Sequence, residues 1–282
     1  MIPAHDDFLP DLVQPTMICA FSGWNDAGEA ATRAVEHLSL LWDATEYGVI
    51  ESEDYYDYQV NRPEVRLLGG VSRDLTWPKV HINLARRPRS GRDLVIVTGP
   101  EPNLKWKTFC DEILDVARDL NVEEIVLLGG MSTDTHFERT VPITGSAWDE
   151  ATSRRYSFDR SGYHGPTGIT GVLHDFAVRA GFPAISLWAG TPYYVSAPAW
   201  APATVALIRW LEELLEEPIR LENLQDEAEI AISTVRRLLE ADPSMREQID
   251  ALADEPEVNE GTVEQLTQDV ERYLRRRGGD TG

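Results

Sequence analysis

The chain has 282 residues, of which 42% are hydrophobic, and a formal net charge of −22 at pH 7. This hydrophobic content excludes a disordered chain, and the negative charge argues against nucleic-acid backbones and anionic membranes as partners, because both attract basic faces. No apolar run approaches the roughly 20 residues that a membrane-spanning helix needs.

The start of the chain and its cysteines indicate a cytoplasmic protein. The first residues lack the basic start and the apolar run of a signal peptide. Only Cys19 and Cys110 occur, and both lie in apolar segments. We expect both to be small core residues and not a disulfide pair.

The first predicted unit is a strand, a glycine loop and a helix. Residues 16–21 are mostly apolar, and alanine and leucine then recur at helical spacing up to residue 41. The loop holds Gly23 and Gly28 in the frame of a phosphate-binding loop, but Glu29 stands where such a loop has lysine, so that function is excluded.

Two polar residues in this loop have alternative roles. Asn25 and Asp26 directly precede the predicted helix. Either is a natural N-cap, because its side chain accepts from the unpaired amides of the first helical turn. The alternative is a catalytic role.

The next segments predict short extended pieces. Residues 45–50 read as a second strand. Residues 65–68 and 79–84 are extended pieces, expected as a hairpin or as edge strands because Trp77-Pro78 interrupts them. Four arginines and a proline in residues 86–92 predict an exposed turn.

The middle of the chain repeats the order strand, glycine loop, helix. Residues 93–98 form the clearest buried strand, an amphipathic helix follows through residue 117, and residues 123–128 form the next strand. This repeat predicts parallel strands with crossover helices. Residues 141–147 are expected as an edge strand.

Glycines at 165, 168 and 171 recur every third residue where another helix should begin. Two interpretations stay open. The loop binds an anion on the free amides of the first helical turn, or the glycines only permit close packing of helix on strand. An apolar strand at 184–188 follows.

The last part of the chain has only helical periodicity. An amphipathic helix from about residue 205 ends at Pro218, and residues 211–282 carry 20 acidic and 8 basic side chains. Helices then start at Pro243 and, with a capping box of Thr262 and Gln265, near residue 262. We expect an α/β domain over residues 1–220 and a helical lobe over 221–282.

The loops at the carboxyl ends of parallel strands share one edge of the sheet, where ligands bind. That edge should gather ten residues around one pocket. His136 or His164 beside a carboxylate fits a general base, or is an ordinary loop histidine. The sequence contains no metal-ligand spacing and no cofactor motif, so neither is expected. The candidate pocket residues are Gly23, Asn25, Asp26, Glu101, Asp134, His136, His164, Thr167, Tyr193 and Tyr194.

Five segments together resemble the proteasome assembly chaperone family, in its prokaryotic branch, over about residues 16–216. They begin with Phe21-Ser-Gly-Trp-Asn-Asp-Ala-Gly and include Gly99-Pro-Glu-Pro, Leu128-Gly-Gly, Gly165-Pro-Thr-Gly-Ile-Thr-Gly and Ser186-Leu-Trp-Ala with Pro192-Tyr-Tyr-Val. The resemblance implies a three-layer α/β sandwich with a mainly parallel sheet, akin to the phosphorylase/hydrolase-like fold, plus a helical extension. It also implies an oligomer.

The sequence departs from the family at two places. The His that usually precedes Tyr-Val is Tyr193 here. Members that dock on proteasomes end in a hydrophobic residue, Tyr and one further residue, whereas this chain ends Arg-Gly-Gly-Asp-Thr-Gly. We therefore expect no C-terminal docking on a proteasome.

Our leading hypothesis is a non-catalytic binding or assembly protein, chaperone-like, with itself and another protein as partners. We favour a homotrimer, because tyrosine and tryptophan are common interface anchors and several lie in loop-like stretches. The alternative is an enzyme of phosphorylase/hydrolase-like fold, acting on a small anionic or nucleoside-like substrate at the carboxyl edge of the sheet. The aromatic residues considered are Tyr55, Tyr56, Tyr58, Trp77 and Trp200.

Overall fold

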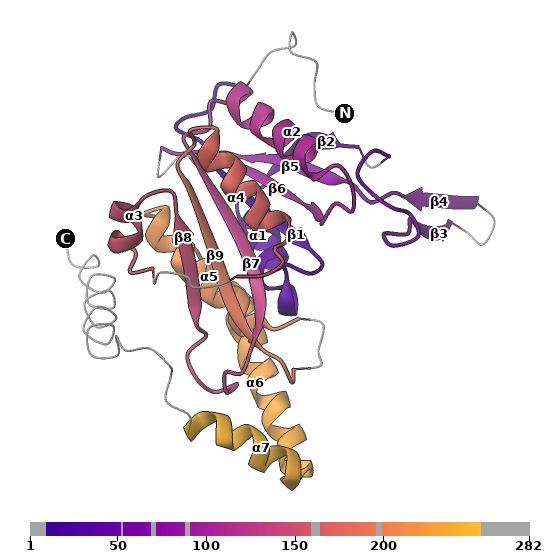
Figure 1. Cartoon of the computed structure of the whole chain (residues 1–282). Helices are drawn as coiled ribbons and strands as arrows, with labels where there is room; N and C mark the ends of the chain where they lie inside the picture. Colours follow the sequence, from indigo (N-terminus) through magenta and orange to yellow (C-terminus); the bar gives the residue numbers. More distant parts are fainter. Residues whose placement is uncertain are drawn as a thin grey trace.

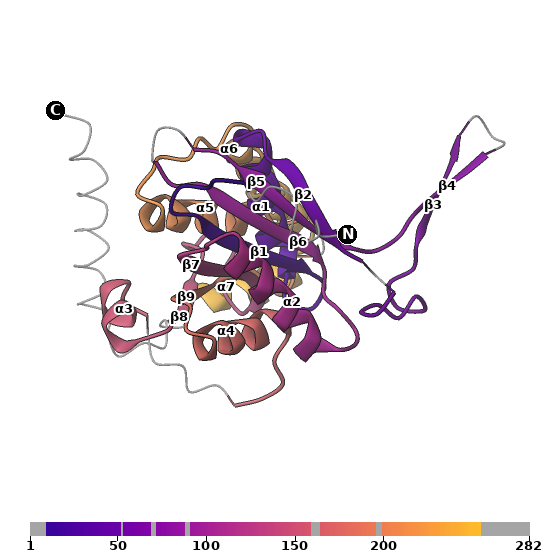
Figure 2. The same cartoon turned by 90° about the horizontal axis from the view of Figure 1, so that it is seen from above.

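A seven-stranded mixed sheet lies between two layers of helices, and a two-stranded hairpin projects from it (Figures 1 and 2). The computed structural model describes residues 10–51, 53–68, 72–87, 91–158, 164–195 and 199–254. The three-layer α/β sandwich expected from the sequence is confirmed.

The strand order in the main sheet is β2-β5-β6-β1-β7-β9-β8. The four central strands β6, β1, β7 and β9 are parallel, while β5 and β8 run antiparallel to their neighbours. The strands are β1 (Thr16–Ser22), β2 (Thr45–Ile50), β3 (Glu64–Leu68), β4 (Ser72–Thr76), β5 (Val80–Ala85), β6 (Leu94–Pro100), β7 (Glu124–Thr133), β8 (Ile143–Ala147) and β9 (Ala184–Pro192).

Helices cover both faces of the sheet because its central strands are apolar on both sides. In β1, Ile18 and Ala20 face one layer, and Met17 and Cys19 face the other. The helices are the 3-10 turn η1 (Ala27–Glu29), α1 (Ala30–Leu41), α2 (Trp106–Asp119), α3 (Glu150–Arg155), α4 (Ile169–Arg179), α5 (Ala201–Leu214), α6 (Leu224–Ala241) and α7 (Pro243–Asp254).

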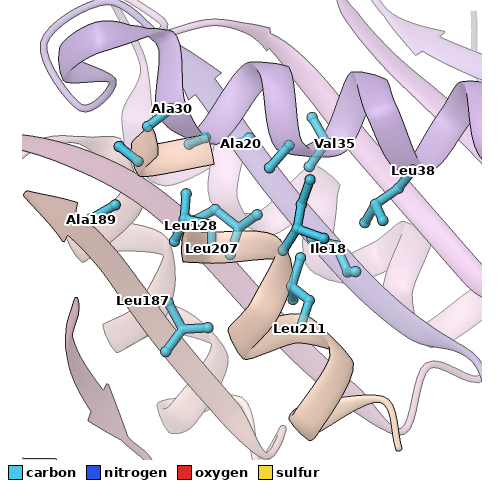
Figure 3. Close-up of a cluster of buried hydrophobic side chains, with 14 of the residues drawn as sticks. Ile18, Ala20, Ala30, Val35, Leu38, Leu128, Leu187, Ala189, Leu207 and Leu211 are labelled. Atoms are coloured by element: carbon cyan, nitrogen blue, oxygen red, sulfur yellow. The ribbon is translucent and has the colours of Figure 1, made fainter. Parts of the chain in front are cut away.

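The larger core cluster lies between the sheet, α1 and α5 (Figure 3). Val35 of α1 and Leu211 of α5 are fully buried there beside Ile18, Leu128 and Leu187 of the strands. The second cluster lies between the opposite face, α2 and α4. Cys19 and Cys110 are free and buried in that cluster, as expected.

The C-terminal helices α6 and α7 extend the layer of α1 and α5. Leu224, Leu239 and Ile249 are buried in the larger cluster, and Arg33 of α1 pairs with Glu227 of α6. The helical lobe therefore shares a core with the sheet, and a boundary at residue 220 stays a prediction. The capping box at Thr262 lies outside the described residues. No helix in the described part of the chain is long and apolar enough to span a bilayer.

One expectation for the middle of the chain was wrong, and another holds only in part. The segment expected as a hairpin or edge strand at 79–84 is β5, an interior strand between β2 and β6. In the turn at 86–92, expected to be exposed, Arg86 and Gly91 are exposed, but Arg87 is only 1% exposed. Its guanidinium binds Glu217 at 3.1 Å and lies over the Trp42 ring, and burial lowers its pKa.

Three of the aromatic residues expected at a subunit interface are instead core residues. Tyr55, Tyr56 and Trp200 are 3%, 3% and 1% exposed within the single chain. Their loops fold back on the sheet, as when the Tyr56 hydroxyl donates to the carbonyl of Pro100 at 2.7 Å. Of the five, Trp77 keeps a large exposed fraction, 45%.

Candidate functional site

The loop after β1 lies across the carboxyl end of the neighbouring strand β7. The amide of Gly130 donates to the carbonyl of Asn25 at 2.8 Å, and Asp26 forms a parallel bridge with Gly130. A Cβ on Gly130 would come within 2.5 Å of the carbonyl oxygen of Ala27. Only glycine therefore permits this approach, which places Asn25 and Asp26 at the sheet edge.

A hydrogen-bonded cluster joins three loops at this edge. Glu101, in the loop after β6, accepts through Oε1 from Asn25 Nδ2 at 2.6 Å and from the amide of Ile169 at 2.8 Å. Asn25 is fully buried, and its Oδ1 accepts no hydrogen bond from the described residues. We call these three residues the Glu101 latch.

The Glu101 latch occupies the N-terminus of α4. Free amides at a helix start favour a negative charge. Here the chain itself supplies that charge, because the carboxylate of Glu101 accepts a hydrogen bond from the backbone amide of Ile169. Gly168 allows the arrangement, because a Cβ there would lie 1.9 Å from Asn25 Oδ1.

Asp26 acts on the first turn of α1. Its Oδ1 accepts from the amide of Ala31 at 2.7 Å, and its Oδ2 accepts from the amide and the hydroxyl of Thr32. Burial raises the pKa of Asp26, although the bonds from Thr32 and Ala31 oppose the shift. The N-cap position of α1 is Glu29, so neither Asn25 nor Asp26 is the N-cap that the sequence predicts; Asp26 instead binds the amides of the first turn from three residues earlier, while Asn25 holds the latch.

A second group of candidate residues lies beyond Gly130, past the end of β7. The Tyr194 hydroxyl accepts from the amide of Phe137 at 2.7 Å and donates to the carbonyl of Thr135 at 3.1 Å. Burial raises its pKa to about 12. His136 is 6% exposed, with Nε2 3.6 Å from Asp250 of α7. This network fastens the loop after β7 to β9 and α7.

The structure thus divides the candidate residues between two networks and leaves others exposed. Gly23, with φ +114°, would place a Cβ 3.7 Å from Glu101 Cβ, so it belongs to the first network. The exposed residues are Asp134, His164, Thr167 and Tyr193. Thr167 places its hydroxyl over the first turn of α4, where a Cβ on Gly171 would meet it at 2.3 Å. The expectation of one shared pocket is therefore not met in this arrangement.

An open pocket of about 440 Å³ does lie at the carboxyl edge, but other residues line it. Arg33, Glu36, Trp77, Lys79 and His81 contribute side chains. Burial raises the pKa of Glu36, and His81 Nδ1 contacts Glu46 at 2.8 Å. The sequence pattern does not reveal this pocket, because it does not show that residues 79–84 lie beside β6.

No group of three His, Cys, Asp or Glu side chains in the described ranges is placed to hold a metal ion. Two histidine–carboxylate pairs occur there, His81 with Glu46 at 2.8 Å and His136 with Asp250 at 3.6 Å, and the second joins the loop after β7 to α7. The carboxylates of Glu101 and Asp26 each accept from backbone amides. The geometry of both networks is that of loop fastening.

Comparison with solved structures finds close likeness to two bacterial proteins. The proteasome-assembly chaperone homologue Rv2125 of Mycobacterium tuberculosis is 43% identical, with a TM-score of 0.78 over 83% of this chain and 99% of that one. A PAC2 family protein from Streptomyces avermitilis is 44% identical, with a TM-score of 0.76 over 79% of this chain and 95% of that one.

More distant structures share the fold. PbaB of Pyrococcus furiosus, described as an archaeal proteasome activator, is 19% identical, with a TM-score of 0.67 over 81% of this chain and 95% of that one. No curated protein sequence matches the chain. The sequence model of the PAC2 family matches residues 20–239, from within β1 to near the end of α6. With that match and relatives above 40% identity, the chain belongs to the PAC2 family.

Proposed function

We propose that the protein is a non-catalytic, chaperone-like assembly factor that binds other protein chains in the cytoplasm and works as a homo-oligomer, with a trimer favoured. The observation that carries the proposal is the Glu101 latch. An enzyme acting on an anion at this edge needs the free amides of α4, and the chain's own carboxylate already holds the amide of Ile169.

The relatives support the assembly part of the proposal. The 43% identical protein from Mycobacterium tuberculosis is described as a proteasome-assembly chaperone homologue. By analogy, the chemistry of the partner is that of a proteasome subunit before it enters the particle, with subunit-facing apolar surface still uncovered. Exposed apolar side chains on this chain, such as Trp24 at 66% and Leu104 at 50%, offer matching contacts.

The test uses purified proteasome α- and β-subunits. We expect the full chain to form a complex with one of them at micromolar concentration, or to raise the yield of assembled rings on native gels. The matched control is an unrelated acidic protein of similar net charge, because non-specific electrostatic association would give the same gel shift. Absence of both complex and effect on ring yield would contradict the proposal.

The open pocket keeps an enzymatic alternative testable. Arg33, Lys79 and His81 bring three basic groups to it, which is the charge that a small anion needs. Two of these groups already contact carboxylates, Arg33 with Glu227 and His81 with Glu46. Phosphate and nucleosides should therefore leave the melting temperature unchanged. A rise that saturates with ligand, and that Lys79→Ala removes, would favour the enzyme.

A further inference from the structure

The open pocket of about 440 Å³ lies where α1, the start of β5 and the end of β6 meet. Its volume is within the range of small-molecule sites, roughly 300–1,000 Å³. None of the three residues of the Glu101 latch lines it. The kind of ligand that it fits depends on the charges of its lining that are not already paired within the chain.

Two basic groups of the pocket are paired within the chain. Arg33 pairs with Glu227, and His81 Nδ1 contacts Glu46 at 2.8 Å. Lys79 forms no ion pair with a carboxylate in the described ranges, and its charge acts on Glu46 only from beyond ion-pair distance. The ammonium of Lys79 is therefore free to bind a carboxylate from outside the chain.

The helix side of the pocket carries unpaired charge of the opposite sign. Glu29 of η1 and Glu36 of α1 line it, with Arg33 between them at helical spacing. Neither carboxylate has an ion-pair or hydrogen-bond partner among the residues that the structure describes. Burial raises the pKa of Glu36, the charge of Arg33 opposes the shift, and the carboxylates of Glu29 and Asp26 add to it. This side of the pocket therefore keeps uncompensated negative charge.

An aromatic side chain completes the lining. Trp77 is 45% exposed, and its ring centroid lies 4.7 Å from that of Tyr58. The contact with Tyr58 restricts the indole, while the exposed part of the ring stays open to the pocket. An indole in this position offers a ligand an apolar contact surface next to the charged groups.

The unpaired charges of the pocket have opposite signs and stand on different elements. A small anion is attracted by Lys79 but repelled by Glu29 and Glu36. A small cation is attracted by the two glutamates but repelled by Lys79. A molecule that carries both an ammonium and a carboxylate satisfies both sides at once, and amino acids and short peptides have this chemistry.

We propose that this pocket binds a small zwitterion with an apolar side chain, either a free amino acid or a short peptide. Its ammonium contacts Glu29 and Glu36, its carboxylate contacts Lys79, and its side chain lies on Trp77. The site goes beyond the proposed function, because its ligand is not a protein chain. A ligand this small in an open pocket should have a dissociation constant of about 1 mM, so purification removes it.

The first experiment titrates the full chain with charge variants of one ligand and follows the heat of binding. L-phenylalanine and alanyl-phenylalanine carry both charges, N-acetyl-phenylalanine carries only the carboxylate, and phenylalanine amide carries only the ammonium. We expect saturable binding of L-phenylalanine or the dipeptide, whichever matches the natural source, and binding of both single-charge forms that is weaker by about tenfold or more.

Three results of this titration would overturn the inference. Equal binding of the N-acetyl form would show a simple anion site. Equal binding of the amide would show a simple cation site. Absence of saturable binding by all four compounds would show that the pocket takes no such ligand.

The second experiment assigns each charge of the ligand to its partner. Lys79→Met should weaken binding of L-phenylalanine about tenfold and abolish its advantage over the amide, because the carboxylate then has no partner. Glu29→Gln combined with Glu36→Gln should abolish its advantage over the N-acetyl form. The exposed controls Lys107→Met and Glu247→Gln change charge outside the pocket and should bind as the wild type does. Pocket variants that keep both the circular dichroism and the binding of the wild type would overturn the inference.

Discussion

Removing the carboxylate of Glu101 tests the latch that holds three loops at the sheet edge. In Glu101→Ala, the fully buried amide of Asn25 loses its acceptor at 2.6 Å, and the amide of Ile169 loses its acceptor at 2.8 Å. Hydrogen bonds to a charged group contribute about 1.5–3 kcal/mol each. Glu101 is itself half-buried, so water partly replaces it. We therefore expect a loss of roughly 2–4 kcal/mol in the free energy of unfolding.

The conservative variant separates charge from geometry. Glu101→Gln keeps an acceptor oxygen for both donors but removes the negative charge at the start of α4, an effect of about 1 kcal/mol. The assay is urea unfolding followed by circular dichroism, with Glu53→Ala as an exposed-glutamate control. On heating, Glu101→Ala should melt roughly 5–12 °C below the wild type. A loss no larger than that of Glu53→Ala would refute the latch.

Three further predictions concern the same fold. Gly28→Ala should lower the free energy of unfolding, measured in urea, by about 2–4 kcal/mol, because φ at Gly28 is +67° and the new Cβ would lie 2.8 Å from Trp200 Cβ. An unchanged urea midpoint would show that the loop relaxes without cost and would contradict this prediction. Burial raises the pKa of Asp26, so the folded state binds its proton more readily than the unfolded state. The free energy of unfolding of the wild type, relative to that of Asp26→Asn, should therefore fall as pH rises from 3.8 to the folded-state pKa and stay constant above it. If this difference in unfolding free energy does not change with pH, the effect of burial on Asp26 is contradicted. A chain of residues 1–220 should keep the sheet and its circular dichroism but melt at lower temperature, since α6 and α7 no longer cover the larger cluster; aggregation on purification would show that these helices complete the core.

The layered fold was predictable because its signals are local. The apolar run that became β6 and the glycine loops after β1 and β7 stand out in the sequence, and they imply parallel strands with crossover helices. Edge strand β8 also matched its expected position. Each of these depends on residues within one segment.

The contacts at the sheet edge were not predictable because each joins distant segments. Glu101 meets Asn25 and Ile169 across 76 and 68 residues. The buried Arg87 pairs with Glu217 across 130 residues and lies over the ring of Trp42. The sequence indicated that the loops converge at one edge of the sheet. Which side chains bond to one another there depends on the lengths of the loops and on the twist of the sheet, and neither can be read from a sequence pattern.

The hairpin of β3 and β4 shows that a visible sequence signal can still leave the position of a strand open. Its extended pieces were visible in the sequence, but alternation of apolar and polar residues predicts a half-buried strand whether the cover comes from the same chain or another. Only the structure shows that β3 and β4 leave the main sheet while β5 enters it.

Native mass spectrometry of the full chain purified from its own cells tests the central claim that this protein acts by binding protein chains. We predict masses that are multiples of 31.7 kDa, alone or with a bound protein, and no retained small molecule. A single species of 31.7 kDa carrying the mass of a phosphate or nucleoside ligand would contradict the account and favour the enzyme.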